Sequence, residues 1–419
     1  MNLIFFDLPD RREALKPFTF TRPVAMLRVG ILTLHEKWEQ RLKPLGTPGP
    51  SSHLTEEYLS EKYPLTIADD NLLINAAVYP TEGLVQQVTN LRPGQAIKHE
   101  GTFVAARWPQ EKLAHLTTEF VQQNAYPVVA GSVLERALAV VSSQAQNVVM
   151  LAHPWDIFTH NEAQIRQDYA LVTQQRTSQK LADPYTRIYQ PDQVFLEEGA
   201  VVRASIINAE EGPVYIGKNA TVHENAVIKG PFAMLENSHV NIGSKIREAT
   251  TIGPHCKVGG EVKNTVFMAN SNKGHEGFIG NSVVGEWCNF GADTNTSNLK
   301  NNYQQVRMWS YARRAYQNTG LQFCGLLMGD HSKCSINTMF NTGTMVGVFA
   351  NIFGADFPPK FVPSFTWGGT FGQGNAVYDF DKAVEVFERI LKRRGLAIAD
   401  ADVALLKHVF EQRDTELSN

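Results

Sequence analysis

An apolar residue recurs every six positions through the middle of the chain. The uninterrupted run consists of Ile216, Val222, Ile228, Met234, Val240, Ile246, Ile252 and Val258. Most residues two positions before the later members are small, namely Ala220, Ala226, Ser238, Ser244, Thr250 and Cys256. A period of six fits neither an α-helix nor a single amphipathic strand. It is typical of a parallel β-helix, in which each group of six residues forms one face of a triangular coil.

The same spacing returns twice further along the chain. It is found first at Phe278, Val284 and Phe290, and then at Met328, Cys334, Phe340, Val346 and Ile352. Residues 259–277 and 297–327 fall outside the pattern, so we expect them to form loops that leave the β-helix. Loops on a rigid scaffold often carry the functional residues.

Residues 1–172 have a different pattern. Residues 2–6 form an apolar run typical of a buried strand, residues 29–42 and 132–146 have helical spacing, and residues 147–151 again resemble a strand. Strands that alternate with helices predict a parallel α/β domain.

The remaining boundaries follow from changes in composition. Residues 173–192 are polar and contain prolines, which indicates a linker, and the β-helix is expected over residues 193–370. Residues 371–419 contain two stretches with helical spacing, 381–395 and 400–416, and Gly395 ends the first of them. We therefore expect an α/β domain, a linker, a β-helix and a short C-terminal helical segment.

Composition narrows the classes of function. Lys and Arg number 39 against 42 Asp and Glu, so the net charge of -3 gives no reason to expect nucleic-acid binding. The sequence contains no apolar run of about 18 residues, and its start is charged, so neither a membrane span nor a signal peptide is expected. The protein is predicted to be soluble and cytoplasmic. The widely spaced Cys256, Cys288, Cys324 and Cys334 indicate neither a zinc site nor a disulfide framework.

Two segments carry a family resemblance, EVKNTVFMANSNKGHEGFIGNSVVGEWCNFGADTNTSNLKNNY at 261–303 and FTFTRPVAMLRVGIL at 18–32. With them, the chain resembles the family of bifunctional N-acetylglucosamine-1-phosphate uridyltransferases/glucosamine-1-phosphate N-acetyltransferases, in particular its variant branch in Bacteroidetes-type bacteria. The resemblance implies a nucleotidyltransferase-like (Rossmann-like) first domain, a left-handed β-helix and a homotrimer with active sites between subunits. It also implies three substrates: glucosamine 1-phosphate, acetyl-CoA and UTP.

The resemblance assigns roles to residues of the β-helix. His275, in SNKGH, matches the base that takes a proton from the sugar amine, a role that suits an imidazole. Lys263 and Asn289 match sugar-phosphate-binding positions, and Lys245 and Arg247 are two candidates for the family's arginine, of which only one is needed. Asn298 matches an acetyl-CoA-binding position, and Lys300 lies near the family lysine that follows it but not in register with it. A tyrosine of the family is replaced by Phe278 here.

The segment MWSYARRAYQNTG, 308–320, is aromatic and basic. Because acetyl-CoA carries phosphates and an adenine, Arg313 and Arg314 are candidates to bind it, and a subunit contact is an equally good explanation.

In the first domain the family's glycine-rich phosphate loop is missing. Arg11, Arg12 and Arg22 are the remaining candidates to bind a nucleotide, because arginine can replace backbone donors at a triphosphate. Nucleotidyl transfer also needs Mg²⁺, for which the adjacent Asp69 and Asp70 are candidate ligands, although such pairs more often form turns.

The sequence therefore predicts an enzyme that acetylates glucosamine 1-phosphate in the β-helix and then transfers a uridylyl group in the first domain, giving UDP-N-acetylglucosamine. Two alternatives stay open. The first domain could bind ligands without catalysis, or the whole protein could be a trimeric scaffold without activity.

Overall fold

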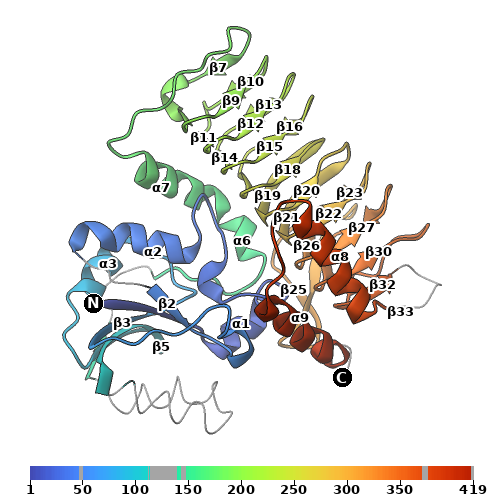
Figure 1. The fold of residues 1–419 in the computed structure, drawn as a ribbon. Coiled ribbons are helices and arrows are strands. Elements are labelled where there is room, and N and C mark those ends of the chain that lie inside the picture. Colours follow the sequence, from blue (N-terminus) through green and yellow to red (C-terminus); the bar gives the residue numbers. More distant parts are fainter. Residues whose placement is uncertain (47–50, 112, 114–138, 143–147, 370–375, 417–419) are drawn as a thin grey trace. The chain divides into compact units, whose positions relative to one another are not determined.

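The computed structural model describes residues 1–46, 51–111, 113, 139–142, 148–369 and 376–416, with the side chains of 139–142 left out (Figure 1). The chain divides into two compact units. Unit 1 consists of Met1–Leu15, Thr21–Leu27 and Leu32–His153, and unit 2 of Lys16–Phe20, Arg28–Ile31 and Pro154–Asn419. Among the described residues, no helix is both long and apolar enough to cross a bilayer.

Unit 1 is built on a six-stranded sheet. Its strands are β1 (Asn2–Phe6), β2 (Ser51–Leu54), β3 (Asp70–Asn75), β4 (Gln95–His99), β5 (Thr102–Pro109) and β6 (Ala139–Ser142), in the order β2-β1-β3-β5-β4-β6. The predicted strand at residues 2–6 is confirmed, and β1 is parallel to both of its neighbours. The expectation of a purely parallel sheet is wrong, because β5 is antiparallel to β3 and β4. Glu100 and Gly101, both with positive φ, join β4 to β5 in a tight hairpin, which fixes that direction.

The helices of unit 1 are α1 (Pro9–Ala14), α2 (Leu34–Leu42) and α3 (Glu82–Thr89). The helix expected over 29–42 begins only at Leu34, where Thr33 and Glu36 form a capping box. Most of the helix expected over 132–146 lies outside the described residues, and its described part, Ala139–Ser142, is strand β6 instead. This part contains Val140 and Val141, whose β-branched side chains favour a strand. The strand expected at 147–151 is reduced to an isolated bridge between Met150 and Val78.

The β-helix of unit 2 is a stack of short parallel strands in three sheets (Figure 1). The first sheet contains β7 (Arg187–Tyr189), β10 (Ile206–Asn208), β13 (Val227–Lys229) and β16 (Lys245–Ile246). The second contains β8 (Val194–Leu196), β11 (Val214–Ile216), β14 (Phe232–Met234), β17 (Thr250–Ile252), β26 (Leu326–Met328), β29 (Thr344–Val346) and β31 (Phe361–Val362). The long strands β19 (Glu261–Ala269) and β21 (Phe278–Glu286) join these two sheets.

The third sheet contains β9 (Val201–Val202), β12 (Thr221–Val222), β15 (His239–Val240), β18 (Lys257–Val258), β20 (Asn272–Lys273), β22 (Asn289–Phe290), β27 (Lys333–Cys334), β30 (Asn351–Ile352) and β32 (Thr366–Gly368). At its end, β33 (Ala376–Val377) pairs with β32 in the antiparallel direction. A separate pair is formed by β23 (Asn295–Thr296) and β28 (Met339–Phe340). The predicted fold class, an α/β domain followed by a parallel β-helix and short helices, is confirmed.

The interior of the β-helix follows the six-residue pattern. All eight residues of the first run, Ile216 to Val258, are buried in its core, and so are the later residues from Met328 to Ile352. The position predicted at Phe278 is wrong by one residue, because Ile279 is in the core and Phe278 is only half-buried. The coils here are shorter than those before them. Paired strands in neighbouring coils show the difference. Val240 pairs with Val258, and Val258 pairs with Lys273, so the second pair is separated by fewer residues than the first.

The two expected loops have different outcomes. Residues 259–277 do not leave the β-helix, since they form β19 and β20, so that prediction is wrong. Most of residues 297–327 leave it, as predicted, and contain an antiparallel hairpin of β24 (Arg307–Ser310) and β25 (Ala315–Asn318). The exception is the end of this range, where β26 of the second sheet begins at Leu326.

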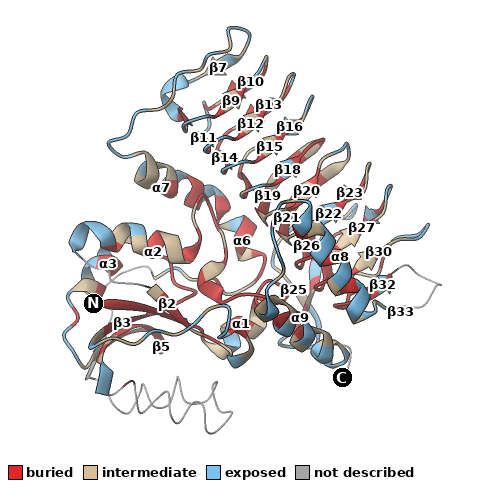
Figure 2. Ribbon diagram, in the orientation of Figure 1, coloured by how far each residue is buried: buried red, intermediate tan, exposed pale blue. Residues whose placement is uncertain are grey.

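Helices flank the β-helix within unit 2. The helices α6 (Asp156–Thr159) and α7 (Asn161–Thr173) precede it, and α7 packs against β14, β17 and β19. The two predicted C-terminal helices are confirmed as α8 (Phe380–Lys392) and α9 (Asp400–Gln412). One side of α8 is exposed and the other is buried (Figure 2), where Phe387 contacts His331 and Trp287. Short 3-10 turns lie at Val24–Met26, Lys43–Leu45, Glu57–Leu59, Pro191–Gln193 and Arg413–Glu416.

Candidate active sites

His275 lies in the turn that follows β20, and its side chain is exposed. Lys273, two residues before it, points into the β-helix and is only 2% exposed. The Lys273 ammonium donates hydrogen bonds to the backbone carbonyls of Gly259 (3.0 Å) and His275 (2.8 Å). Burial lowers the pKa of Lys273 to about 8. A buried cation thus holds the backbone of the turn that presents the imidazole.

Three cations predicted to bind the sugar phosphate come together on the first sheet and its continuation into β19. Lys245 pairs with Glu261 in the strand register, and Arg247 lies 3.6 Å from the Glu261 carboxylate. The Lys263 ammonium lies 3.2 Å from the Glu248 carboxylate, and Arg247 lies 3.7 Å from it. Burial opposes ionisation of Glu248, but hydrogen bonds from its own backbone and from Lys263 lower its pKa overall.

This row of cations extends to the turn that carries His275. The carboxylate of Glu276 lies 4.0 Å from the Lys245 ammonium, and both side chains are largely exposed. The contact thus links Lys245 to the residue that follows the exposed His275.

Asn289, also predicted to bind the sugar, does not lie with these cations. It belongs to β22 in the third sheet, whereas Lys263 belongs to β19. Since the sheets of a triangular coil face in different directions, one chain does not bring Asn289 and Lys263 to the same surface.

Asn298 and Phe278 both pack over Gly280. A side chain at Gly280 would place its Cβ 2.5 Å from the Phe278 ring and 2.8 Å from the Asn298 amide nitrogen. This amide also donates to the side chain of Asn281 at 2.8 Å. Lys300 donates to the carbonyl of Gln305 at 2.8 Å, so its ammonium stabilises the start of the loop.

Arg313 and Arg314 lie in the exposed turn of the β24–β25 hairpin. The hairpin is anchored by Trp309, whose ring stacks on Phe361 with centroids 4.4 Å apart. This stacking fixes the strands of the hairpin, and the two arginines in its turn are exposed to solvent.

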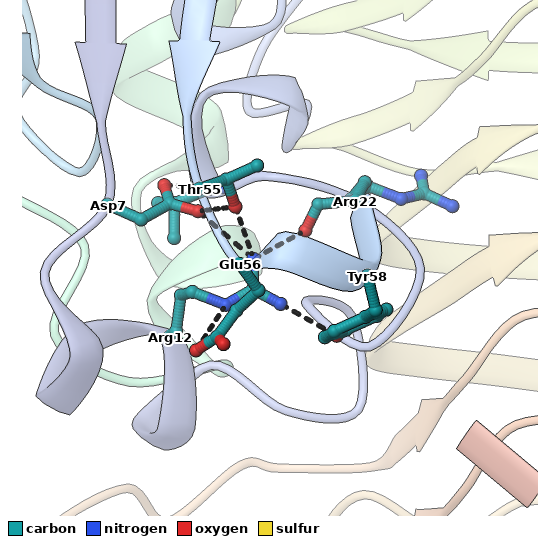
Figure 3. Close-up of polar contacts among 7 residues, drawn as sticks. Asp7, Arg12, Arg22, Thr55, Glu56 and Tyr58 are labelled. Atoms are coloured by element: carbon teal, nitrogen blue, oxygen red, sulfur yellow. Dashed lines mark hydrogen bonds and ion pairs between the residues drawn. The ribbon is translucent and has the colours of Figure 1, made fainter. Parts of the chain in front are cut away.

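In unit 1, Arg12 belongs to a buried polar network at the carboxyl ends of β1 and β2 (Figure 3). Its guanidinium donates to Asp7 (3.0 Å), Thr55 (3.0 Å), Tyr58 (2.9 Å) and the backbone carbonyl of Arg22 (3.2 Å). Burial opposes the charge, but Tyr58, Asp7 and Glu56 outweigh it and raise the pKa of Arg12 above its ordinary value. Arg12 thus holds the segment around Arg22 against the sheet.

The other two arginines predicted to bind a nucleotide differ in exposure. Arg22 is 5% exposed, and Figure 3 shows its guanidinium directed away from the Arg12 network. The Arg11 side chain is 25% exposed and lies 3.9 Å from Asp10. Ligands commonly bind at the carboxyl ends of parallel strands, which is the edge where this network lies.

The predicted metal ligands Asp69 and Asp70 differ in their surroundings. Asp69 is exposed, whereas both carboxylate oxygens of Asp70 accept hydrogen bonds from Arg107, at 2.9 and 2.8 Å. These bonds hold the pKa of Asp70 below its usual value. A cation at Asp70 would compete with Arg107. In the part of the chain that the structure describes, no three His, Cys, Asp or Glu side chains gather to hold a metal ion.

The structure also contains a basic pocket that sequence reasoning missed. Lys257, Lys333, Arg393 and Arg394 line it together with several asparagines. These cations come from three distant segments of the chain, so no local sequence pattern could have indicated them.

Comparison with known proteins agrees with the architecture. Residues 3–177 match the model of the sugar nucleotidyl transferase family. This part of the chain is similar to the sugar nucleotidyl transferases. Apart from this match, the chain is similar to several proteins named bifunctional protein GlmU. The one from Methanocaldococcus jannaschii is 34% identical over 104 residues, which are 24% of this chain and 25% of the relative. The one from Wigglesworthia glossinidia brevipalpis is 36% identical over 110 residues, which are 26% and 22% of the two chains.

A third relative, from Sulfurisphaera tokodaii, is named a bifunctional sugar-1-phosphate nucleotidylyltransferase/acetyltransferase. It is 28% identical over 141 residues, which are 33% of this chain and 35% of the relative. The chain thus spans about a quarter to a third of the length of these curated relatives. The match of residues 3–177 and the similarity to proteins named for two activities agree with the family resemblance, and neither tests the Bacteroidetes-type branch.

Proposed function

We propose that this protein makes UDP-N-acetylglucosamine in two steps, by acetyl transfer to glucosamine 1-phosphate and then uridylyl transfer to the product. The observation that carries the proposal is the exposed imidazole of His275 beside the Lys245–Glu276 contact, on a β-helix that follows a sugar nucleotidyl transferase domain. The named activities of the relatives support the same pair of reactions.

In the first step, the sugar amine attacks the thioester carbonyl of acetyl-CoA. A carbon–nitrogen bond forms, the carbon–sulfur bond breaks, and coenzyme A leaves as its thiol. His275 accepts the proton that the amine loses and passes it to the leaving sulfur, while Lys245, Arg247 and Lys263 bind the phosphate. Asn298, Lys300, Arg313 and Arg314 are proposed to bind acetyl-CoA, since they lie in or beside the loop that leaves the β-helix.

We infer that the acetyl-transfer site is completed in a homotrimer. Asn289 and Lys263 lie on different sheets of the β-helix, so a site that uses both needs a second copy of the chain. The measurement for this part is the molar mass in solution, which should be three times 46.7 kDa.

In the second step, a phosphate oxygen of N-acetylglucosamine 1-phosphate attacks the α-phosphorus of UTP, and pyrophosphate leaves. We place this reaction at the carboxyl ends of β1 and β2, near Arg11 and Arg22, where the buried Arg12 network fixes the local backbone. Mg²⁺ would neutralise charge on the leaving pyrophosphate, and Asp69 is the candidate ligand whose carboxylate is exposed. A cytoplasmic location is part of the proposal, because acetyl-CoA and UTP are cytoplasmic metabolites.

The test supplies glucosamine 1-phosphate with acetyl-CoA, then UTP with Mg²⁺, and follows thiol and pyrophosphate release separately. His275→Ala should slow thiol release by roughly 10²-fold or more, because it removes the base. When N-acetylglucosamine 1-phosphate is supplied directly, pyrophosphate release should be unaffected. His223→Ala, earlier in the β-helix, is the matched control and should leave both rates unchanged.

The outcomes separate the alternatives. Thiol release that depends on His275, without pyrophosphate release, would reduce the first domain to a ligand-binding module. Failure to detect either product with the wild-type protein would overturn the proposal and favour a scaffold.

A further inference from the structure

A pocket of about 620 Å³ lies between α8 and the β-helix in unit 2. It is lined by Asn237, His255, Lys257, Asn270, Asn272, Trp287, Cys288, Asn289, Lys333, Ile390, Arg393 and Arg394. Four of these residues are cations and none is an Asp or Glu. Such a lining favours an anion.

Two of the cations are held in place by the protein. The Lys333 ammonium donates to the backbone carbonyl of His331 at 2.8 Å, and burial lowers its pKa to about 8. Arg394 donates to the side chain of Asn270 at 2.7 Å and lies over the Trp287 ring, 5.0 Å from its centroid. Both side chains are therefore oriented before any ligand binds.

The other two cations, Lys257 and Arg393, are exposed, and neither forms an ion pair within the described ranges. Arginines near the end of α8 also complement the helix dipole, which by itself would explain Arg393 and Arg394. The dipole does not explain Lys257 and Lys333, which come from strands β18 and β27 of the β-helix. Four cations from two sides of one pocket need a further explanation.

The asparagines add neutral hydrogen-bonding groups. Asn237, Asn270, Asn272 and Asn289 line the pocket, and the side-chain oxygen of Asn272 is buried without a hydrogen-bond partner in the described structure. A buried acceptor of this kind is costly unless a ligand donates to it. The hydroxyls of a sugar or the amine of a base are suitable donors.

Within one chain, the pocket is separate from the turn that carries His275. Asn237, His255, Asn270 and Trp287 have φ of 55°, 57°, 56° and 60° and form the corner that precedes the third-sheet strands. His275 follows the end of one of these strands, β20. The pocket corner and the proposed base thus lie at opposite ends of the strands of the third sheet.

We propose that this pocket binds a nucleotide through its diphosphate, with Lys257, Lys333, Arg393 and Arg394 around the phosphates and the asparagines around the sugar or base. A diphosphate matches four cations better than a single phosphate does, and the volume suits a ligand larger than an inorganic anion. The proposal rests on the proposed function and deepens it, because Asn289 lines the pocket and is also proposed to bind the sugar across the subunit contact. Coenzyme A and UDP-N-acetylglucosamine both carry this chemistry.

The test is calorimetric titration of the full chain with each of these two ligands in turn. The double variant Lys257→Gln with Arg393→Gln removes the two exposed cations, and Lys392→Gln is the matched control on the same helix, outside the pocket. For one of the two ligands, the double variant should weaken one binding step by roughly 10²-fold, while the control binds like the wild type. The ligand that responds identifies the nucleotide.

Unfolding curves of the three proteins should coincide, because the substituted side chains are exposed. The proposal is overturned if both ligands bind the double variant with the affinity and stoichiometry of the wild type. Because the measurement needs no turnover, failure of the proposed acetyl or uridylyl transfer would leave this result intact.

Discussion

Lys273 is a cation at a position inside the β-helix where the neighbouring coils have Val258 and Phe290. Burying a charge costs free energy unless the charge is well paired, and here the partners are two backbone carbonyls. The cost is tolerated at the turn that presents His275, where it orders the backbone. Stability and activity should therefore respond to this residue in opposite directions.

The variant Lys273→Met tests this expectation. Its free energy of unfolding at pH 7 should be no lower than that of the wild type, because an apolar side chain of similar length replaces a buried charge. Thiol release should fall by roughly tenfold, since the backbone of the His275 turn loses its donor. Lys218→Met, which removes an exposed lysine, should change neither quantity.

The pH dependence gives an independent check on Lys273. Its pKa is about 8 in the folded protein and near 10.5 in the unfolded chain, so the unfolded chain binds more protons between these values. The stability of the wild type relative to Lys273→Met should thus rise between pH 8 and pH 10. Denaturant titrations at pH 7 and pH 9.5 measure the difference, and a constant difference would contradict the assigned role.

The Arg12 network in unit 1 is a second case in which one residue decides local stability. Asp7→Ala leaves the Arg12 guanidinium buried without its carboxylate, which should cost about 3–5 kcal/mol. Asp10→Ala removes a carboxylate that is 73% exposed and should change stability by less than about 0.5 kcal/mol. Urea unfolding of both variants measures the contrast, and equal effects would show that the network is not stabilising.

At the scale of elements, the close stacking of coils makes particular glycines necessary. A Cβ at Gly253 would lie 1.8 Å from the backbone carbonyl oxygen of Met268 in the next coil, and backbone cannot move aside as a flexible side chain can. Gly83, at the start of α3, has nothing within 4 Å of such a Cβ.

The same substitution should therefore have different effects at the two sites. Gly253→Ala is expected to destabilise the β-helix by about 2 kcal/mol or more, because the coils must separate. Gly83→Ala should leave stability unchanged or raise it by up to about 1 kcal/mol, since alanine favours a helix. Thermal unfolding of the two variants is the measurement, and a similar loss in both would refute the packing argument.

The strands also show which parts of the fold could be predicted from the sequence pattern. The six-residue period predicted the core residues from Ile216 to Val258 because each coil there has the same length. It failed near Phe278, where shorter coils shift the phase and the chain crosses a corner within a continuous strand. Alternation of strands and helices predicted the α/β domain, but the hairpin at Glu100 and Gly101, which makes the sheet mixed, was missed.

At the scale of the whole molecule, the proposed function rests on sequence motifs and not on hydrophobic spacing. The residues around His275 are close together in the sequence, so a resemblance could point to them. The basic pocket joins residues 237 and 394, and only the folded chain brings these together. The assignment of Lys16–Phe20 and Arg28–Ile31 to unit 2 also depends on contacts with residues far along the chain, which no local sequence pattern shows.

Two short segments near the start of the chain, Lys16–Phe20 and Arg28–Ile31, belong to unit 2. The backbone N–H groups of Gly30 and Ile31 donate to Asn161 (2.7 Å) and Asp168 (2.9 Å) on α7, and the Gly30 carbonyl accepts from Thr251 of the β-helix (3.1 Å). A shorter chain that ended after unit 1 would therefore contain Gly30 and Ile31 but not the residues to which they are hydrogen-bonded. Exchange of the gene segment for the first unit alone would separate these backbone groups from their partners, so we expect the two units to be inherited together.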